Sequence, residues 1–208
     1  MPPNSPPAAP ERLVVATANA GKLLEFRELL AGLPLQIVSL ASLGLPSPEE
    51  TGTSFRENAL LKARHAQSLT HSAVLADDSG LEVDALGGAP GIRSARYAGI
   101  GADDFANNAK LIAALHGVPQ EQRSARYRCV LVFLPAPAEE GPIIAEGVWC
   151  GRIASAARGT GGFGYDPYFY LPELGLNAAE LDPADKNRLS HRAQAMRILR
   201  RALDERYR

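Results

Sequence analysis

Two adjacent carboxylates, Asp77 and Asp78, follow an apolar run of strand-forming residues that begins at Val74. Charges at the end of a buried strand are unfavourable unless a cation or hydrogen-bond donors compensate them. Because successive strand residues face opposite ways, one aspartate can point into a site while its neighbour supports it from behind. Ser79 and Gly80 follow, and they favour a sharp turn and offer amide donors. We therefore expect the strand to end here and the pair to bind a metal or act in catalysis. An ordinary strand-ending turn is the alternative.

A second polar segment joins an expected strand over 12–17 to an expected helix over 20–31. The free amides and the dipole at the start of a helix attract anions, and a lysine adds a point charge suited to phosphate. The full P-loop pattern is missing, so no P-loop is predicted. The segment consists of Thr17, Ala18, Asn19, Ala20, Gly21 and Lys22. It is a candidate anion site, with an ordinary helix cap and a solvated lysine as the alternative.

Lysine is scarce in this chain, with four lysines against eighteen arginines. Three of the four, Lys22, Lys62 and Lys186, lie in polar segments that are suspected on other grounds. A lysine in such a chain suggests that a compact ammonium group is needed in place of the guanidinium fork of arginine.

A glycine-dense loop over 159–164 matches the pattern G-x-G-x-x-G. A dinucleotide-binding loop must open a helix, whereas this loop leads into strand-like, proline-containing residues, so that function is excluded. The loop can still approach a ligand closely, and Phe163 and Tyr165 can stack on a flat ring. Packing of these aromatic rings in the core is the alternative.

The last expected helix runs from Ser190 to about Glu205, and His191 and Arg192 lie at its start. These two residues are candidates for binding a ligand. The alternative is a charged cap on a surface helix.

The composition fits one domain over 11–208 that is large enough for a full core, since 46% of the 208 residues are hydrophobic. A net charge of -1 gives no reason to expect nucleic-acid or membrane partners. Residues 1–10 are proline-rich and are expected to be a disordered tail. Two distant cysteines, Cys129 and Cys150, favour a reduced, cytoplasmic protein. No apolar run is long enough to cross a bilayer.

Strand and helix patterns alternate along the chain, as in a layered α/β domain. Ser54 and Glu57 form an expected capping box for a helix that ends near Leu69, on which Asn58 and Lys62 share a face. Asp103 caps a further expected helix. The other expected strands cover 35–40, 74–77, 127–134, 143–151 and 168–171, of which 127–134 and 143–151 suggest a long hairpin.

Taken together, these segments closely resemble the inosine-triphosphate pyrophosphatase family over nearly the whole chain after the tail. The resemblance rests on Thr17–Lys22, Glu49–Ala63, Ala76–Leu81, Gly87–Tyr97, Gly159–Pro167 and Ser190–Arg192. Ala18 departs from the family pattern, which often has glycine or serine there. The resemblance implies an α/β fold of two lobes around a long mixed β-sheet, with the active site in the groove between them, and a homodimer.

The resemblance also implies the reaction: a non-standard purine nucleoside triphosphate such as ITP, dITP or XTP and water give the monophosphate and pyrophosphate, with Mg²⁺. It makes Asp78 the general base and a metal ligand, with Glu50 and Asp77 helping to hold the metal. Residues 17–22, Lys62 and Lys186 would hold the triphosphate. The remaining nucleotide-binding residues would be Ser79, Phe163, Gly164, Tyr165, Asp166, His191 and Arg192.

Two alternatives remain open. A nucleotide pyrophosphatase of the septum-formation type shares the general architecture, but the Asp-Asp-Ser-Gly and Ser-His-Arg segments argue against it. A sensor that binds a triphosphate without hydrolysing it would not need Glu50 and Asp78. Pyrophosphate release from a panel of nucleotides separates these possibilities.

Overall fold

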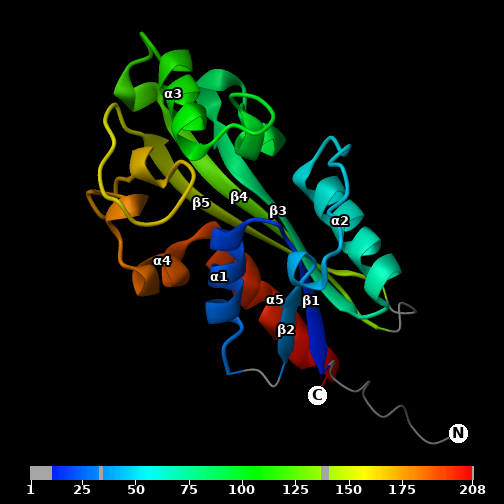
Figure 1. Cartoon of the computed structure of the whole chain (residues 1–208). Helices are drawn as coiled ribbons and strands as arrows, with labels where there is room; N and C mark the ends of the chain where they lie inside the picture. The colour runs from blue at the N-terminus through cyan, green and yellow to red at the C-terminus, as the bar shows by residue number, and fades with distance from the viewer. Residues whose placement is uncertain (1–10, 33–34, 137–140, 208) are drawn as a thin grey trace, which may run out of the picture. The chain divides into compact units, whose positions relative to one another are not determined.

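The computed structural model describes residues 11–32, 35–136 and 141–207. Seven strands form one mixed sheet in the order β2-β1-β3-β4-β5-β6-β7 (Figure 1). The strands are β1 (Arg12–Ala16), β2 (Gln36–Ser39), β3 (Ala73–Val83), β4 (Ser124–Leu134), β5 (Ile143–Ile153), β6 (Phe169–Leu171) and β7 (Leu176–Asn177). The helices are α1 (Ala20–Leu29), α2 (Phe55–Thr70), α3 (Asp104–Ala114), α4 (Pro183–Leu189) and α5 (His191–Tyr207). The expected α/β class with a mixed sheet is confirmed, and the expected tail over 1–10 lies outside the described residues.

The chain divides into two compact units. Unit 1 comprises Met1–Asp78, Val130–Glu146 and Ala195–Arg208, and unit 2 comprises Ser79–Cys129 and Gly147–Gln194. The groove between two lobes and the single domain over 11–208 stay predictions, and each unit is described by itself below.

In unit 1, β1 lies between two parallel neighbours. Val14 is opposite Val38 of β2 on one side and Val74 of β3 on the other, and Val14 is fully buried. Parallel strands covered on both faces favour such continuous apolar runs. On α2, Ala59, Ala63 and Ala66 are fully buried at helical spacing, so small side chains let this helix pack closely.

The expectation that the strand over 74–77 ends at the Asp77-Asp78 pair is wrong. β3 continues through Ser79 and Gly80 to Val83, because Leu81 and Val83 are fully buried in the core of unit 2 and extend the apolar pattern. The two carboxylates therefore lie in mid-strand, where each needs a partner from another element.

The core of unit 2 is an aromatic and aliphatic cluster that includes residues of β4, β5 and α3. The ring centroids of Tyr127 and Phe169 lie 4.5 Å apart, and those of Trp149 and Phe169 lie 5.5 Å apart. Leu111 and Leu115 place α3 against this cluster. β4 and β5 are neighbours in the sheet, which agrees with the expected hairpin.

The termini of the helices follow the local sequence signals only in part. The Ser54 hydroxyl accepts the Glu57 amide, as expected, but the Glu57 carboxylate accepts hydrogen bonds from the amide and hydroxyl of Thr53. α4 was not expected from the sequence; it begins after the N-cap Asp182, with Pro183 in its first turn. Lys186, an expected site residue, therefore lies on a helix that the sequence did not predict.

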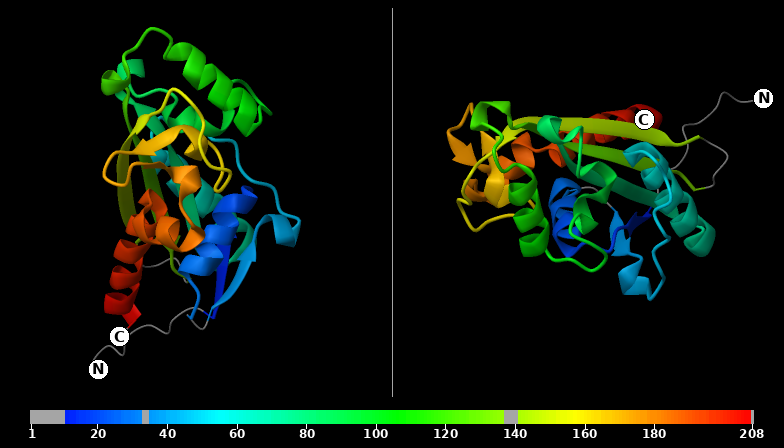
Figure 2. Two further views of the ribbon diagram at one scale, coloured as in Figure 1. Left: turned by 90° about the vertical axis from the view of Figure 1, so that its left-hand side faces the viewer. Right: turned by 90° about the horizontal axis from the view of Figure 1, so that it is seen from above.

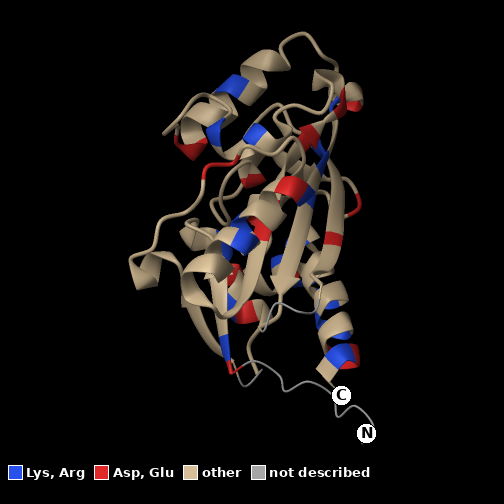
Figure 3. Ribbon diagram, turned by 90° about the vertical axis from the view of Figure 1, so that its right-hand side faces the viewer, with Lys and Arg blue, Asp and Glu red and all other residues tan. Residues whose placement is uncertain are grey.

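Basic and acidic residues are interspersed along the ribbon (Figure 3). In the part of the chain that the structure describes, no helix has both the length and the apolar character to span a membrane. Cys129 is buried, Cys150 is exposed, and both are free thiols.

Candidate active site

Asp77 is paired with a lysine from the segment between β1 and α1. Lys22 Nζ lies 2.7 Å from Asp77 Oδ2, and Asp77 is only 1% exposed. Asn19 caps α1 by accepting the Lys22 amide at 3.0 Å, and Thr17 accepts the Asn19 amide. The expected anion segment is thus a helix start whose lysine reaches back to the strand.

Lys62 is the centre of the second set of contacts. Its Nζ lies 2.7 Å from Glu50 Oε1, 2.7 Å from Asp78 Oδ1 and 3.0 Å from the carbonyl oxygen of Asp77. Burial alone would lower the pKa of Lys62, but the charges of Asp78, Asp77 and Glu50 outweigh it and raise the pKa above its ordinary value. Lys62 therefore remains an ammonium ion at neutral pH.

Asp78 is in the opposite electrostatic situation. Burial raises its pKa above the ordinary value, while the ammonium groups of Lys62 and Lys22 oppose this shift. A carboxylate with a raised pKa is a stronger base, so Asp78 is suited to accept a proton from water. Its neighbour on the strand, Asp77, pairs with a different lysine, as the alternation of the strand predicts.

Asn58 shares a face of α2 with Lys62, but the sequence predicted no role for it. Asn58 is fully buried, its Oδ1 accepts the Gly52 amide at 2.8 Å, and its Nδ2 donates to Asp78 Oδ2 at 3.3 Å. A Cβ on Gly52 would lie 2.6 Å from Asn58 Oδ1. Asn58 therefore joins the loop that follows Glu50 to the Asp78 carboxylate.

The donor atoms of this cluster suit a hard cation. Mg²⁺ prefers oxygen ligands and is often held by one or two carboxylates together with substrate phosphates. Glu50 and Asp78 converge on one ammonium group and provide two carboxylates. Among the described residues, no group of three or more His, Cys, Asp or Glu could hold a metal. The chemistry fits Mg²⁺ shared with a substrate, and the role of Asp77 as a third ligand stays a prediction.

A second cluster lies within unit 2 around Asp166. Lys186 Nζ lies 2.7 Å from Asp166 Oδ2, which also accepts the Phe163 amide at 2.9 Å, and the Tyr127 hydroxyl donates to Oδ1. Lys186 Nζ lies 4.5 Å from the centroid of the Phe163 ring, within range of a cation–π interaction. Lys186 thus contacts both the Asp166 carboxylate and the Phe163 ring.

His191 and Arg192 belong to the same cluster. The His191 ring stacks on Tyr127 with centroids 4.7 Å apart, and the Arg192 guanidinium carbon lies 5.8 Å from the centroid of Phe163. His191 is 5% and Arg192 1% exposed, so the alternative of a charged cap on a surface helix is wrong. Tyr127 was not among the expected site residues, because a tyrosine on a strand carries no local sign that it will contact Asp166 and His191.

Tyr165 does not act as a stacking platform. Its ring is buried in the core of unit 2 and its hydroxyl donates to the Ser94 carbonyl at 2.7 Å. Burial raises the pKa of this phenol, which stays neutral. The core therefore holds the ring of Tyr165, and only the half-buried Phe163 stays a candidate for stacking on a ligand. Gly164, between them, has a positive φ, and Ser79 lies half-buried on β3 next to Asp78.

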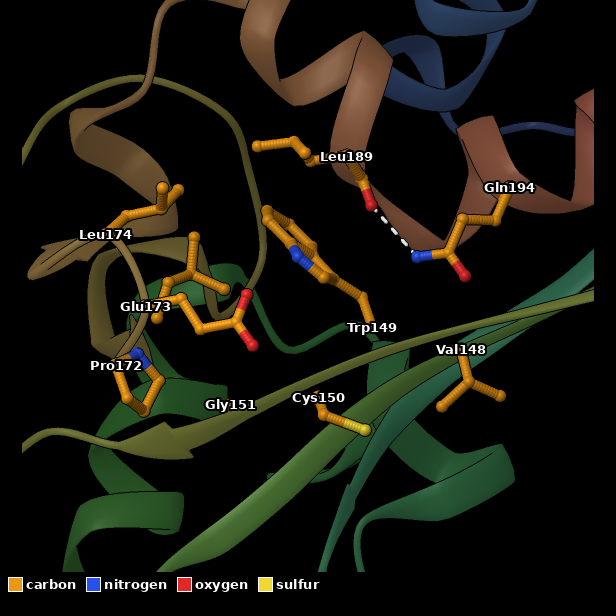
Figure 4. A pocket seen from close by; sticks show the side chains of 10 residues that line it. Val148, Trp149, Cys150, Gly151, Pro172, Glu173, Leu174, Leu189 and Gln194 are labelled. Atoms are coloured by element: carbon orange, nitrogen blue, oxygen red, sulfur yellow. Dashed lines mark hydrogen bonds between the residues drawn. The ribbon is translucent and has the colours of Figure 1, made fainter.

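A pocket of about 440 Å³ also lies in unit 2, and Figure 4 shows its lining side chains. The side chain of Trp149 lies beside Leu189, whose carbonyl accepts a hydrogen bond from Gln194 at 3.0 Å. Glu173 is the one charged lining residue, and none of the expected site residues is among the lining residues. This pocket lacks the lysines and paired carboxylates that the expected chemistry requires.

The α/β fold brings lysines of α1 and α2 against carboxylates of β3, and such positive and negative groups can supply the positioning and charge neutralisation on which phosphoryl transfer depends. The chain belongs to the Ham1 family, whose model matches residues 13–202. This confirms the resemblance found in the sequence.

Relatives of the chain match it over nearly their full length. A dITP/XTP pyrophosphatase of Thioalkalivibrio sulfidiphilus is 58% identical over 90% of this chain and 96% of the relative. The HAM1 protein of Coxiella burnetii has a similar structure, with a TM-score of 0.85 and 45% identity over 93% of this chain and 98% of that chain. A nucleoside-triphosphatase / dITP/XTP pyrophosphatase of Mycobacterium abscessus has a TM-score of 0.71 and 42% identity over 90% of this chain and 98% of that chain.

Proposed function

We propose that this protein hydrolyses non-standard purine nucleoside triphosphates, namely ITP, dITP and XTP, to the monophosphate and pyrophosphate. The reaction would remove deaminated purines from the nucleotide pool. The observation that carries the proposal is the ammonium group of Lys62, which lies 2.7 Å from both Glu50 and Asp78. Relatives named dITP/XTP pyrophosphatase, 58% identical and matched over almost their whole length, support the choice of substrate.

Asp78 acts as the general base. Its Oδ1 is bound by Lys62, whereas Oδ2 receives the longer bond from Asn58 and has capacity to take a proton. A water molecule transfers its proton to Asp78 as its oxygen bonds to the α-phosphorus, and the bond from that phosphorus to the bridging oxygen of pyrophosphate breaks. The buried position of Asp78 strengthens it as a base, because burial raises its pKa.

Glu50 and Asp78 would hold Mg²⁺, with Asp77 as a further candidate. When bound, the ion supplies charge neutralisation on the phosphates as a Lewis acid. Lys22 and Lys62, with the helix start over 17–22, provide the protein's own positive charge for the triphosphate and for the leaving pyrophosphate. Each of these lysines is already oriented by a carboxylate on β3.

The cluster in unit 2 binds the rest of the nucleotide. The Phe163 ring stacks on the base, and Asp166, His191 and Arg192 offer hydrogen-bonding groups to its edge. Lys186 stays a candidate for the triphosphate, although its contacts with Asp166 and Phe163 favour the base. Ser79, Gly164 and Tyr165 complete the set through their backbone and packing.

Two further proposals concern location and partners; the first rests on the two distant cysteines, and the second on the family resemblance and the net charge. The protein acts in the cytoplasm, and it forms a homodimer without nucleic-acid or membrane partners. Light scattering coupled to size-exclusion chromatography tests the dimer, because it gives the molar mass directly.

The reaction is tested by measuring pyrophosphate and phosphate separately from ITP, dITP, XTP, GTP and ATP with and without Mg²⁺. We expect pyrophosphate as the product, dependence on Mg²⁺, and preference for the first three nucleotides. Release of phosphate, or binding without turnover, would contradict the proposal. Equal hydrolysis of all five would leave a pyrophosphatase but reject its role in removing deaminated purines.

A further inference from the structure

Gly164 in the glycine-rich loop is hydrogen-bonded on both sides to α3. Its amide donates to Asp104 Oδ2 at 2.6 Å, and its carbonyl oxygen accepts from Asn108 Nδ2 at 2.8 Å. Asp104 and Asn108 are four residues apart and therefore lie on one face of the helix. α3 and the loop lie side by side in both Figure 1 and the left view of Figure 2, and all these residues belong to unit 2.

The two bonds fix the two peptide groups that flank Gly164. One peptide follows Phe163, and the other precedes Tyr165. The φ of Gly164 is +64°, so the chain turns at this residue in a conformation that side chains disfavour. The direction of the Phe163 side chain depends on the peptide that follows it. The amide of Phe163 donates to Asp166, so the position of the loop also affects this bond.

Close packing does not hold the loop on this side. A cavity of about 580 Å³ is lined by α3, including Asp104 and Asn108, and by residues 160–164 of the loop. On this side the loop therefore faces a cavity, and the two hydrogen bonds from α3 contribute to its position.

The Asn108 side chain contains a polar atom whose burial is unfavourable for stability. It is 7% exposed, and its Oδ1 has no hydrogen-bond partner among the described residues, whereas its Nδ2 also donates to the Asp104 carbonyl. A buried unpaired acceptor disfavours the folded state. An apolar side chain of the same size would avoid this cost but would lose the bond to Gly164.

We propose that Asp104 and Asn108 are positioning residues that determine purine selectivity, because they hold Gly164 and thereby place Phe163 and Asp166 against the base. This inference rests on the proposed function, in which Phe163 and Asp166 bind the base.

The chain provides a matched control in the neighbouring Asn107. Asn107 is 3% exposed, accepts the Ala98 amide at 2.8 Å and donates to the Ala95 carbonyl at 3.3 Å, so it holds a different loop. Asn107→Leu and Asn108→Leu both remove a buried amide from α3. Comparing them separates general destabilisation from an effect on the glycine-rich loop.

The test compares kcat/KM for ITP and GTP in the two variants and the affinity for IMP measured by calorimetry. For Asn108→Leu we expect the ITP:GTP ratio and the IMP affinity each to fall about tenfold, as for loss of one buried hydrogen bond. The change is expected in KM, with kcat for ITP nearly unchanged. Hydrogen exchange of residues 160–166 should also become faster. Asn107→Leu should change none of these quantities.

Asp104 gives an independent check by conservative rescue. Asp104→Asn keeps an oxygen that can accept the Gly164 amide and should retain most of the selectivity, whereas Asp104→Ala should lose it. A selective wild-type enzyme whose ITP:GTP ratio stays unchanged in Asn108→Leu, or changes equally in Asn107→Leu, would overturn the positioning role alone. Equal hydrolysis of ITP and GTP by the wild type would overturn the proposed function, and this inference with it.

Discussion

Lys62 and Asp78, sixteen residues apart in the chain, meet with 2.7 Å between Nζ and Oδ1. The contact joins α2 to β3 inside unit 1, and it pairs a cation with a carboxylate whose pKa burial raises. The ammonium group keeps the buried carboxylate ionised enough to act as a base, and it also adds positive charge where a phosphate would bind. One ion pair thus supports both the general base and the binding of the phosphate in the proposed reaction.

Asp78→Asn removes the base while keeping the size of the side chain. We expect kcat to fall by about 10²- to 10⁴-fold, which is typical for loss of a general base. Circular dichroism should show a folded protein. More than a tenth of the wild-type kcat at saturating Mg²⁺ would reject the assignment.

The raised pKa of Asp78 predicts how stability depends on pH. The folded state binds this proton more tightly than the unfolded state, so the wild type loses stability as the pH rises through the window between the unfolded and the raised folded pKa. The Asp78→Asn variant has no carboxyl group at this position, so it does not lose stability in this way. The difference in Tm, variant minus wild type, should therefore grow more positive from pH 4 to pH 7 when both are measured in EDTA. A difference that is flat or declines over this range would contradict the raised pKa.

Asn58 should couple the loop after Glu50 to Asp78. Asn58→Leu leaves the Gly52 amide without its acceptor and should destabilise the protein by about 1–3 kcal/mol. It should also raise the Mg²⁺ concentration that gives half-maximal activity. Gly52→Ala places a Cβ against the same Asn58 oxygen, so the two losses should add only in part in the double variant, where the contact with Glu57 Cβ at 2.8 Å remains. Additive losses would show that the two residues act separately.

Gly162 is expected to be essential to the Asp166 site. Its φ is +72°, and an added Cβ would collide with the Asp166 carboxylate. Gly175 has a similar φ of +69°, but a Cβ there would meet nothing within 4 Å. Both alanine variants carry the backbone strain, but only Gly162→Ala should raise KM for ITP, by about tenfold or more, as for loss of one well-placed hydrogen bond. Equal KM values would show that the collision is relieved elsewhere.

Arg192 is predicted to contribute to base selectivity. Hypoxanthine and xanthine present an oxygen acceptor where adenine presents an amino group. A donor such as Arg192 near Phe163 therefore favours hypoxanthine and xanthine over adenine. We expect Arg192→Ala to reduce the preference for ITP over ATP by about 10- to 100-fold, since an unmatched buried donor costs about 1–3 kcal/mol. Arg188→Ala, at a side chain that is 69% exposed, is the control and should leave the preference unchanged. Because Arg192 is buried, Tm is measured in parallel; a lower Tm with an unchanged preference would assign it a structural role.

The sequence by itself determined the family and the order of most elements, with β7 and α4 as the exceptions. Apolar periodicity located β1, α1 and α2, and the motif residues retained their expected places at the start of α1, on β3 and at the start of α5. These features are local, because they depend on the spacing of residues within one strand or helix. The exclusion of a dinucleotide loop at 159–164 was also local, since the next residues form a 3₁₀ turn and β6 and no helix.

Only the tertiary structure decided which charged groups meet and which are buried. Lys22 reaches Asp77 across 55 residues, and Lys186 reaches Asp166 across 20. The burial of Leu81 carried β3 past Asp78, where local composition favoured a turn. Arginine is usually exposed, but Arg192 is buried by the packing around the start of α5. Partner choice and burial depend on the distances between elements far apart in the chain, and these are set by the packing of the core rather than by the spacing of neighbouring residues.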